Sequence, residues 1–189
     1  MRNKDTFLAL GCIIIGFAYR LIPGHPSNVT PVATMALVGG MYMSRKWLAF
    51  VAPILALYVG DLILNNTILR GFYPEHSGLV LWSDYMAFNI LAMAATVGIG
   101  FLLMRKATST KILAGGLAAS ILFFFVTNFG SWLTMPIYPK TIGGLLSCLG
   151  AGIPFFRNTL IGNFVFVIAF IGAIDFWRKS AKSSYLAKV

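Results

Sequence analysis

Charged residues are scarce in this sequence. Only 11% of its 189 residues are Asp, Glu, Lys or Arg, and 58% are hydrophobic, whereas an ordinary soluble domain has about 25% charged residues. This composition excludes a soluble globular domain and indicates a membrane protein. The length leaves room for about six spanning helices of roughly 20 residues each, as one integral membrane domain over residues 1–189.

Acidic residues are the rarest of the charged ones. Five Asp and Glu stand against fifteen Lys and Arg, which gives a net charge of +10. Such an excess can indicate nucleic-acid binding, but here long apolar runs separate the basic residues. That placement is typical of membrane topology, so the expected surroundings are a lipid bilayer and no nucleic-acid partner is predicted.

Cysteine and histidine are also rare, with two residues of each. Cys12 and Cys148 lie in segments that the expected topology does not bring together, so neither a disulfide nor a Cys-based zinc site is predicted. His25 and His76 have no spacing typical of metal ligands. We therefore predict no cofactor and no metal centre.

Six apolar runs without charge indicate candidate spanning helices, at residues 7–19, 30–43, 47–60, 85–104, 112 to about 133 and 158–174. With six spans and the amino terminus inside, eleven of the fifteen basic residues fall on the cytoplasmic side. The second run is short and could be re-entrant, but omitting it would move Arg45 and Lys46 outside. The sequence predicts an all-α membrane protein with six transmembrane helices and both termini in the cytoplasm.

The outer connection over residues 134–156 is unusual. Its part from 141 to 156 is apolar and holds four glycines, with Pro154 near its end. Irregular backbone exposed to lipid would leave polar groups without hydrogen bonds. We expect this connection to pack on the bundle as a lid.

Polar residues within the apolar runs gather toward one side of the membrane. Counting about 1.5 Å per residue from the basic clusters, Arg20, Asp61, Asn128 and the pair Arg157 and Asn158 all lie at the outer level. Polar groups within spans usually face the bundle interior or a wet cavity. This asymmetry predicts a cavity open to the outside and sealed toward the cytoplasm.

Helical spacing places an aromatic residue beside hydrogen-bonding residues three times, since residues three or four apart share a face. The three stripes are Tyr58 with Asp61 and Asn65, Trp82 with Tyr85 and Asn89, and Phe124 with Asn128 and Trp132. Apolar walls with a few polar groups are typical of sites for small ring compounds. The alternative is that the amides only join neighbouring helices and the aromatics form an interfacial belt.

Arg20 and Arg157 stand against a single Asp61 at this level. One interpretation is an ion pair that joins helices. The other is that the second Arg binds a carboxylate, phosphate or carbonyl-rich ligand through paired hydrogen bonds.

Several strings resemble a family of small bacterial membrane proteins. They are RLIPGHPSNVTPVA at 20–33, DL at 61–62, VTNFGSW at 126–132, YPKT at 138–141 and IPFFRNTLIGN at 153–163. That family is similar to the S components of energy-coupling-factor vitamin transporters, above all to solitary ones proposed for cobalamin. The resemblance implies a six-helix, S-component-like bundle in the bacterial inner membrane that captures a vitamin outside and releases it inside, with an energy-coupling module as a partner.

The resemblance also indicates which residues could contact the cobalt ion of a corrinoid. Solitary cobalamin-type relatives use a cysteine near the outer end of their third helix as a cobalt ligand, but the stretch 65–77 has none. This leaves His76 in that stretch, and His25 in the first outer loop, as the residues that could contact a cobalt ion.

The leading hypothesis is a membrane protein that binds and takes up a vitamin-like small organic molecule, cobalamin or a related corrinoid being the candidate that the resemblance implies. Its predicted site residues are Arg20, Tyr58, Asp61, Asn65, Tyr85, Asn89, Asn128, Trp132, Arg157 and Asn158. Two alternatives stay open: an intramembrane enzyme with Asp61 as general base acting on a periplasmic or lipid-linked substrate, and a structural subunit of a membrane complex. None of the common catalytic motifs is present.

Overall fold

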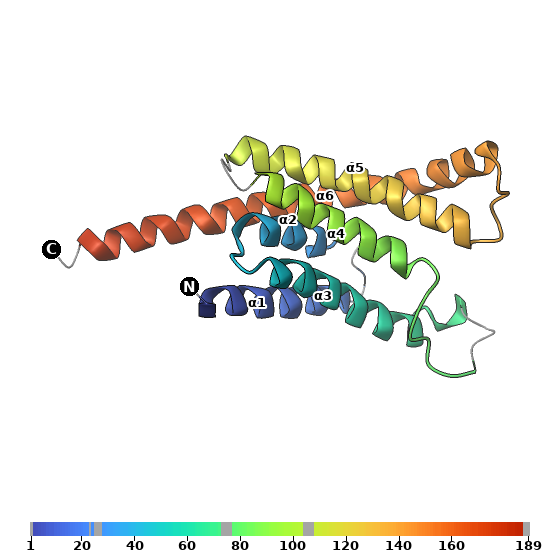
Figure 1. Cartoon of the computed structure of the whole chain (residues 1–189), viewed down its shortest axis with the longest axis horizontal. Coiled ribbons are helices and arrows are strands. Elements are labelled where there is room, and N and C mark those ends of the chain that lie inside the picture. The colour runs from blue at the N-terminus through green and yellow to red at the C-terminus, as the bar shows by residue number, and fades with distance from the viewer. Residues whose placement is uncertain (1, 23, 25–27, 73–76, 104–107, 187–189) are drawn as a thin grey trace.

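The computed structural model describes residues 2–22, 24, 28–72, 77–103 and 108–186, with side chains over 6–7, 9–19, 21–22, 24, 28–71, 77–103 and 108–173. Over these residues the protein is all-helical, as predicted, and has no strand. Its elements are α1 (Arg2–Arg20), α2 (Val32–Tyr42), α3 (Lys46–Asn66), the short 3-10 helix η1 (Arg70–Phe72), α4 (Met86–Leu103), α5 (Ser109–Thr134) and α6 (Ile142–Leu186) (Figure 1).

Four helices are long and apolar enough to cross a membrane, namely α3, α4, α5 and the part Ile142–Ala173 of α6. These helices support the prediction of a membrane protein. The apolar run at 30–43 forms a helix of only 11 residues, α2, which is shorter than the roughly 20 residues that a span needs. Helix α2 therefore fills only part of the length of the bundle interior.

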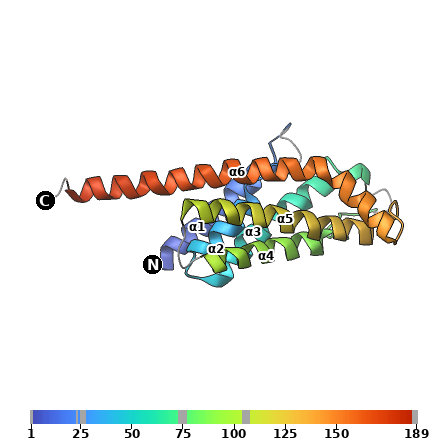
Figure 2. The ribbon, with the colours of Figure 1, turned by 90° about the horizontal axis from the view of Figure 1, so that it is seen from above.

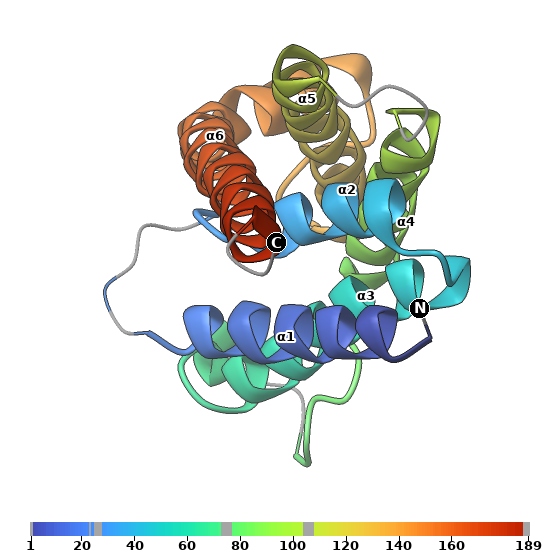
Figure 3. The ribbon, with the colours of Figure 1, turned by 90° about the vertical axis from the view of Figure 1, so that its left-hand side faces the viewer.

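Helix α2 is the centre of the fold. It packs against each of the other five α-helices in the described part of the chain, and it lies in the middle of the bundle when the molecule is viewed from the end that carries both termini (Figure 3). Nine of its residues are buried, because its sequence is apolar on every face, as expected for a core helix.

Glycines let α2 approach α4 closely. A Cβ atom added to Gly100 would lie 2.9 Å from the Cα atom of Gly40 and 3.1 Å from the carbonyl carbon of Leu37. Both neighbours belong to the backbone of α2, so only glycine fits at this crossing. Small residues that bring backbones together are the usual basis of helix packing in membranes.

The expected connection over 134–156 is much shorter than predicted. Irregular backbone covers only residues 135–141, and α6 begins at Ile142 and continues for 45 residues. The first part of α6 is bent relative to the rest (Figure 2), and Pro154 lies inside the helix, where proline commonly produces a kink. A helix satisfies the backbone hydrogen bonds of this apolar segment internally, and its glycines do not prevent this.

Two side chains hold the short connection. The indole nitrogen of Trp132 donates to the carbonyl oxygen of Pro139 at 2.9 Å, and Lys140 donates to the carbonyl oxygens of Trp132 and Met135. Helix α6 then runs along the bundle and extends beyond it at the end that carries the amino terminus (Figures 1 and 2).

Candidate functional site

A cavity of about 500 Å³ lies in the half of the bundle away from both termini. Its walls come from α3, α4, α5 and α6, and from residues 28–30, which lead into α2. This position follows from the length of α2. Because α2 begins only at Val32, the interior beyond that residue is enclosed by the four longer helices and is not filled by a fifth.

The turn into the cavity depends on two residues. Asn28 has a φ of +64°, in the left-handed region that Asn adopts more readily than most residues. Thr30 accepts a hydrogen bond from the backbone N–H of Val32 at 3.4 Å, at the start of α2. Both Asn28 and Thr30 line the cavity, so this segment forms one of its walls.

Aromatic side chains make up much of the remaining wall. The rings of Phe124 and Phe156 lie 4.8 Å apart between centroids, and they join α5 to α6. Further apolar contact comes from Met93 of α4. Six aromatic residues line the cavity: Tyr85, Phe123, Phe124, Tyr138, Phe155 and Phe156.

Asp61 is the acidic residue of the cavity wall. It lies near the end of α3, is only 4% exposed and belongs to the cavity wall. Among the described lining residues it is the one Asp or Glu, and none of those residues is Lys, Arg or His. The other hydrogen-bonding residues of the wall are neutral: Asn28, Thr30, Asn89, Thr127, Asn128, Ser131, Thr159 and Asn163.

A buried hydrogen-bond network closes the cavity on the side toward the termini. The amide nitrogen of Asn163 donates to the hydroxyl of Ser120 at 2.7 Å, and the hydroxyl of Thr34 donates to the amide oxygen of Asn163 at 3.4 Å. All three side chains are buried. The network joins α2, α5 and α6 and separates the cavity from the apolar half of the bundle.

Asn128 is held against α6. Its amide nitrogen donates to the carbonyl oxygen of Phe124 at 2.8 Å, and the thiol of Cys148 donates to the carbonyl oxygen of Asn128 at 3.3 Å. A Cβ atom on Gly152 would overlap the Asn128 side chain, so this glycine provides the space that the amide occupies. Tyr138, in the segment after α5, completes this wall. Burial raises the pKa of its hydroxyl, and the Cys148 thiol adds to the rise, so Tyr138 is neutral at physiological pH.

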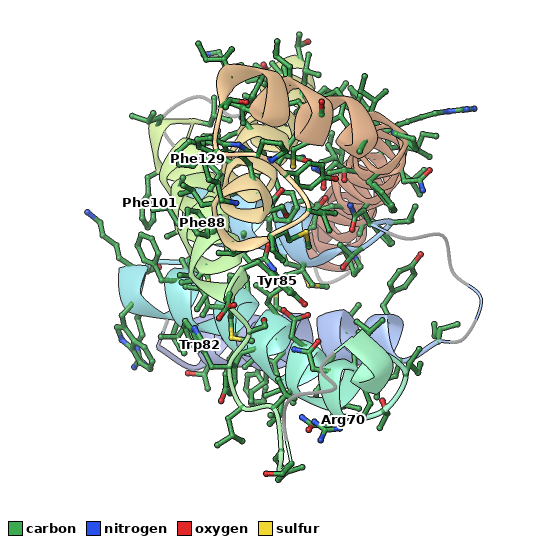
Figure 4. All side chains as sticks on the ribbon, turned by 90° about the vertical axis from the view of Figure 1, so that its right-hand side faces the viewer. Arg70, Trp82, Tyr85, Phe88, Phe101 and Phe129 are labelled. Carbon is green, nitrogen blue, oxygen red and sulfur yellow. The ribbon has the colours of Figure 1, made fainter. Side chains whose placement is uncertain are left out.

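Figure 4 shows Tyr85 toward the middle of the bundle, whereas Trp82 lies at the outside. The Tyr85 hydroxyl donates to the amide oxygen of Asn65 at 3.5 Å. Asn65 is only 1% exposed, and its amide nitrogen has no acceptor among the described residues. Asn65 therefore does not line the cavity itself, but its side chain contacts Tyr85, which does.

The structure brings four of the predicted site residues together in the cavity wall: Asp61, Tyr85, Asn89 and Asn128. They come from α3, from α5 and from α4 with the turn before it, and they represent all three stripes. Three further predicted residues cannot be placed relative to the cavity. The side chain of Arg20 and both His25 and His76 lie outside the described residues.

The other predicted residues do not line the cavity. Arg157 is exposed, and Tyr58, Trp132 and Asn158 are partly buried. On α6 the wall is formed instead by neighbours of the predicted pair, Phe155, Phe156, Thr159 and Asn163. Arg157, one of the two arginines considered for binding an anionic group, is thus not part of the described wall.

Several wall residues were not predicted, notably Asn28, Thr30, Tyr138 and Cys148. Asn28 and Thr30 lie between Pro26 and Pro31 and were assigned to an outer loop. The alternative of a re-entrant second segment would have placed them inside the bundle. Tyr138 and Cys148 were assigned to a lid, and their position depends on the early start of α6. Over the residues that the structure describes, no group of three or more His, Cys, Asp or Glu could hold a metal ion.

The chain matches a family of unknown function (DUF6580) over residues 1–185, and it therefore belongs to that family. No curated protein and no solved structure matches the chain. What this protein does must be inferred from the cavity itself.

Proposed function

We propose that this member of the family binds a small organic molecule in the cavity and takes it up across the membrane. The observation that carries the proposal is the cavity of about 500 Å³, which falls within the roughly 300–1,000 Å³ typical of small-molecule sites. Apolar and aromatic walls with a few polar groups are the usual composition of such sites.

The cavity volume bears on the size of the ligand. One water molecule has a share of liquid volume of about 30 Å³, so the space corresponds to a compound with one or two rings and short substituents. A complete corrinoid is several times larger. We therefore favour a vitamin-like compound of single-ring or double-ring size over cobalamin.

The direction of uptake follows from charge. Basic residues concentrate near the termini and in the α2–α3 connection, and such residues favour the cytoplasmic side of a membrane. We infer that the cavity faces outward from the cytoplasmic membrane of a bacterium, with both termini inside. Helix α2 and the Asn163 network would then lie between the bound compound and the cytoplasm. Release inside requires these elements to rearrange, for which an energy-coupling partner is the proposed free-energy source.

One observation favours a second candidate function. A buried carboxyl in a ligand cavity is also the arrangement of a general base, so Asp61 could act on a bound substrate. An enzyme of this kind would convert its ligand, whereas an uptake protein would return it unchanged.

The test is to purify the protein in lipid nanodiscs from cells grown on rich medium and to identify bound compounds by mass spectrometry. Ala151 lines the cavity from α6, so Ala151→Phe is expected to abolish binding by filling it. The matched control is Ala118→Phe, at an exposed position of α5 that does not line the cavity.

We expect a stoichiometric compound in the wild type and in the control, and none in Ala151→Phe. If no compound is retained and none from a panel of ring compounds raises the melting temperature, the proposed function is wrong. Conversion of an added compound by the purified protein would establish the enzyme instead.

A further inference from the structure

We propose that the ligand of this cavity is a planar heterocycle whose edge carries a hydrogen-bond donor directly beside an acceptor, as in a lactam or an aminopyrimidine, and that Asn89 binds this edge. The inference rests on the proposed function and deepens it, because it assigns a hydrogen-bonding class to the bound compound. One observation carries it. Asn89 lines the cavity, and over the part of the chain that the structure describes its side-chain amide has no hydrogen-bond partner.

The polar residues of the wall differ in what they can still offer a ligand. Thr127 and Thr159 each donate to a backbone carbonyl oxygen four residues earlier in their own helix, at 2.7 and 3.0 Å. The amide of Asn163 both donates and accepts within the network that closes the cavity. These side chains are already bonded to the protein, and the two threonines can only accept from a ligand.

Asn89 is the contrasting case. It lies in the first turn of α4 and is partly buried, and its backbone N–H donates to the carbonyl oxygen of Tyr85 at 3.2 Å. A ligand that fills the cavity displaces water from the Asn89 side chain, so it must supply the hydrogen bonds that this amide loses. Asn28 also lines the cavity, but it is exposed, so water can satisfy its side chain while a ligand is bound.

The shape of the amide defines the complementary edge. The NH2 and C=O groups of Asn lie side by side in one plane, and they offer donors and an acceptor together. An edge with a donor beside an acceptor forms two parallel hydrogen bonds with such a group, which is how Asn binds adenine. An edge with only an acceptor or only a donor leaves one atom of Asn89 without a partner.

A second amide comes from α5. Asn128 donates one N–H to the carbonyl oxygen of Phe124 and lies against Gly152, where an added Cβ atom would overlap it. Its oxygen and its other N–H remain for a ligand. Ser131 is three residues further along α5, on the same face, and also lines the cavity. The expected ligand therefore has further polar substituents, while its plane stacks on the aromatic wall.

The experiment uses three uncharged probes with the same two-ring framework, so that differences in binding reflect hydrogen bonding and not charge. They are carbostyril, which is a lactam, N-methylcarbostyril, in which a methyl group replaces the donor hydrogen, and quinoline, which has only an acceptor. Their dissociation constants are measured on the full-length protein in nanodiscs, directly or by displacement of the compound that the protein retains.

The variant Asn89→Leu removes the donor and the acceptor with little change in volume. The matched control is Asn158→Leu, the same substitution at a partly buried position of α6 that does not line the cavity. Asn89→Ala is measured beside them, because it removes the same groups without any possibility that a leucine side chain blocks the ligand. The melting temperature of each variant shows whether it is folded.

We expect carbostyril to bind the wild type about 10-fold more tightly than either other probe, or better, because it alone pairs with both atoms of Asn89. Both Asn89 variants should reduce this preference to below about 3-fold, and they should bind quinoline as the wild type does, which would show that their cavities are intact. Asn158→Leu should keep the preference.

Equal binding of the three probes by the wild type, or an unchanged preference in both Asn89 variants, would overturn the assignment. Loss of the preference in Asn158→Leu as well would overturn the role of Asn89. A retained compound without such an edge would also overturn the assignment, while leaving the proposed function in place. If neither a retained compound nor any binding is found, the proposed function fails and the assignment fails with it.

Discussion

The close crossing of α2 and α4 makes Gly100→Ala a sensitive test of the fold. The added Cβ atom would lie 2.9 Å from the Cα atom of Gly40 and 3.1 Å from the carbonyl carbon of Leu37, and it would overlap the Leu37 carbonyl oxygen. These are backbone atoms within a helix, so they cannot move aside as a side chain would. The two helices must separate to accommodate the methyl group.

Two opposing effects set the size of the change. Overpacking a close contact costs about 1–3 kcal/mol, and this site belongs at the upper end because backbone meets backbone. Replacing Gly by Ala within a helix contributes about 0.8–1 kcal/mol of stability. We therefore expect Gly100→Ala to lower the free energy of unfolding by about 1–2 kcal/mol.

Helix α4 also provides the control. Gly98 lies two residues before Gly100 in the same helix, and a Cβ atom added there would meet nothing within 4 Å. Gly98→Ala should therefore leave stability unchanged or raise it by up to about 1 kcal/mol. Unfolding of both variants in mixed micelles, followed by circular dichroism against the fraction of denaturing detergent, measures the difference. If Gly100→Ala proves as stable as Gly98→Ala, the close packing of α2 against α4 is refuted.

Three further predictions concern the cavity. Gly152→Ala should displace the Asn128 side chain and weaken ligand binding at least 10-fold, whereas Gly150→Ala, where an added Cβ atom meets nothing within 4 Å, should bind as the wild type does in the same titration. Asn28→Gly should retain stability because its φ of +64° suits glycine, while Asn28→Val should lower the melting temperature because a β-branched residue is strained there; equal melting temperatures would contradict this. Asn163→Leu should lower the free energy of unfolding by about 1 kcal/mol, since hydrogen bonds between membrane helices each contribute roughly 0.6–2 kcal/mol, and an unchanged unfolding midpoint would show that the network does not stabilise the bundle.

Much of the helical pattern could be predicted from composition and charge alone. Each of the six apolar runs corresponds to a helix, because a long uncharged segment in a bilayer has no alternative that satisfies its backbone. The length of α2 was not predictable in the same way. An apolar run from 30 to 43 does not reveal that helical hydrogen bonding begins only at Val32, since the start depends on the local turn at Asn28 and Thr30.

Helix α6, in contrast, begins earlier in the sequence than we predicted. Four glycines and Pro154 in the stretch 141–156 favour irregular structure in water, and a connection was therefore expected. In a membrane protein the cost of unsatisfied backbone groups exceeds the low helix propensity of glycine. The stretch is helical, and this brings Cys148 and Gly152 to the cavity.

Helical spacing predicted only part of the candidate site, since Tyr58 and Trp132 share the stripes of Asp61 and Asn128 but do not line the cavity. Asp61 and Asn128 both lie within helices and both line the cavity. Trp82 was grouped with Tyr85 by helical spacing, but α4 begins only at Met86, so Trp82 points elsewhere and is 52% exposed. Which face of α6 turns inward depends on its packing against α5, and the sequence does not specify this.

The continuous helix α6 has a mechanical consequence. From Pro154 to Leu186 it runs without interruption, a length of about 48 Å at ~1.5 Å per residue. Phe156 and Asn163, near the start of this rod, line the cavity, and its far end extends beyond the bundle (Figure 2). A rotation of about 10° at the proline moves the far end by about 8 Å. A small change of angle at Pro154, close to the cavity wall, therefore corresponds to a large displacement of the far end of α6, beyond the bundle.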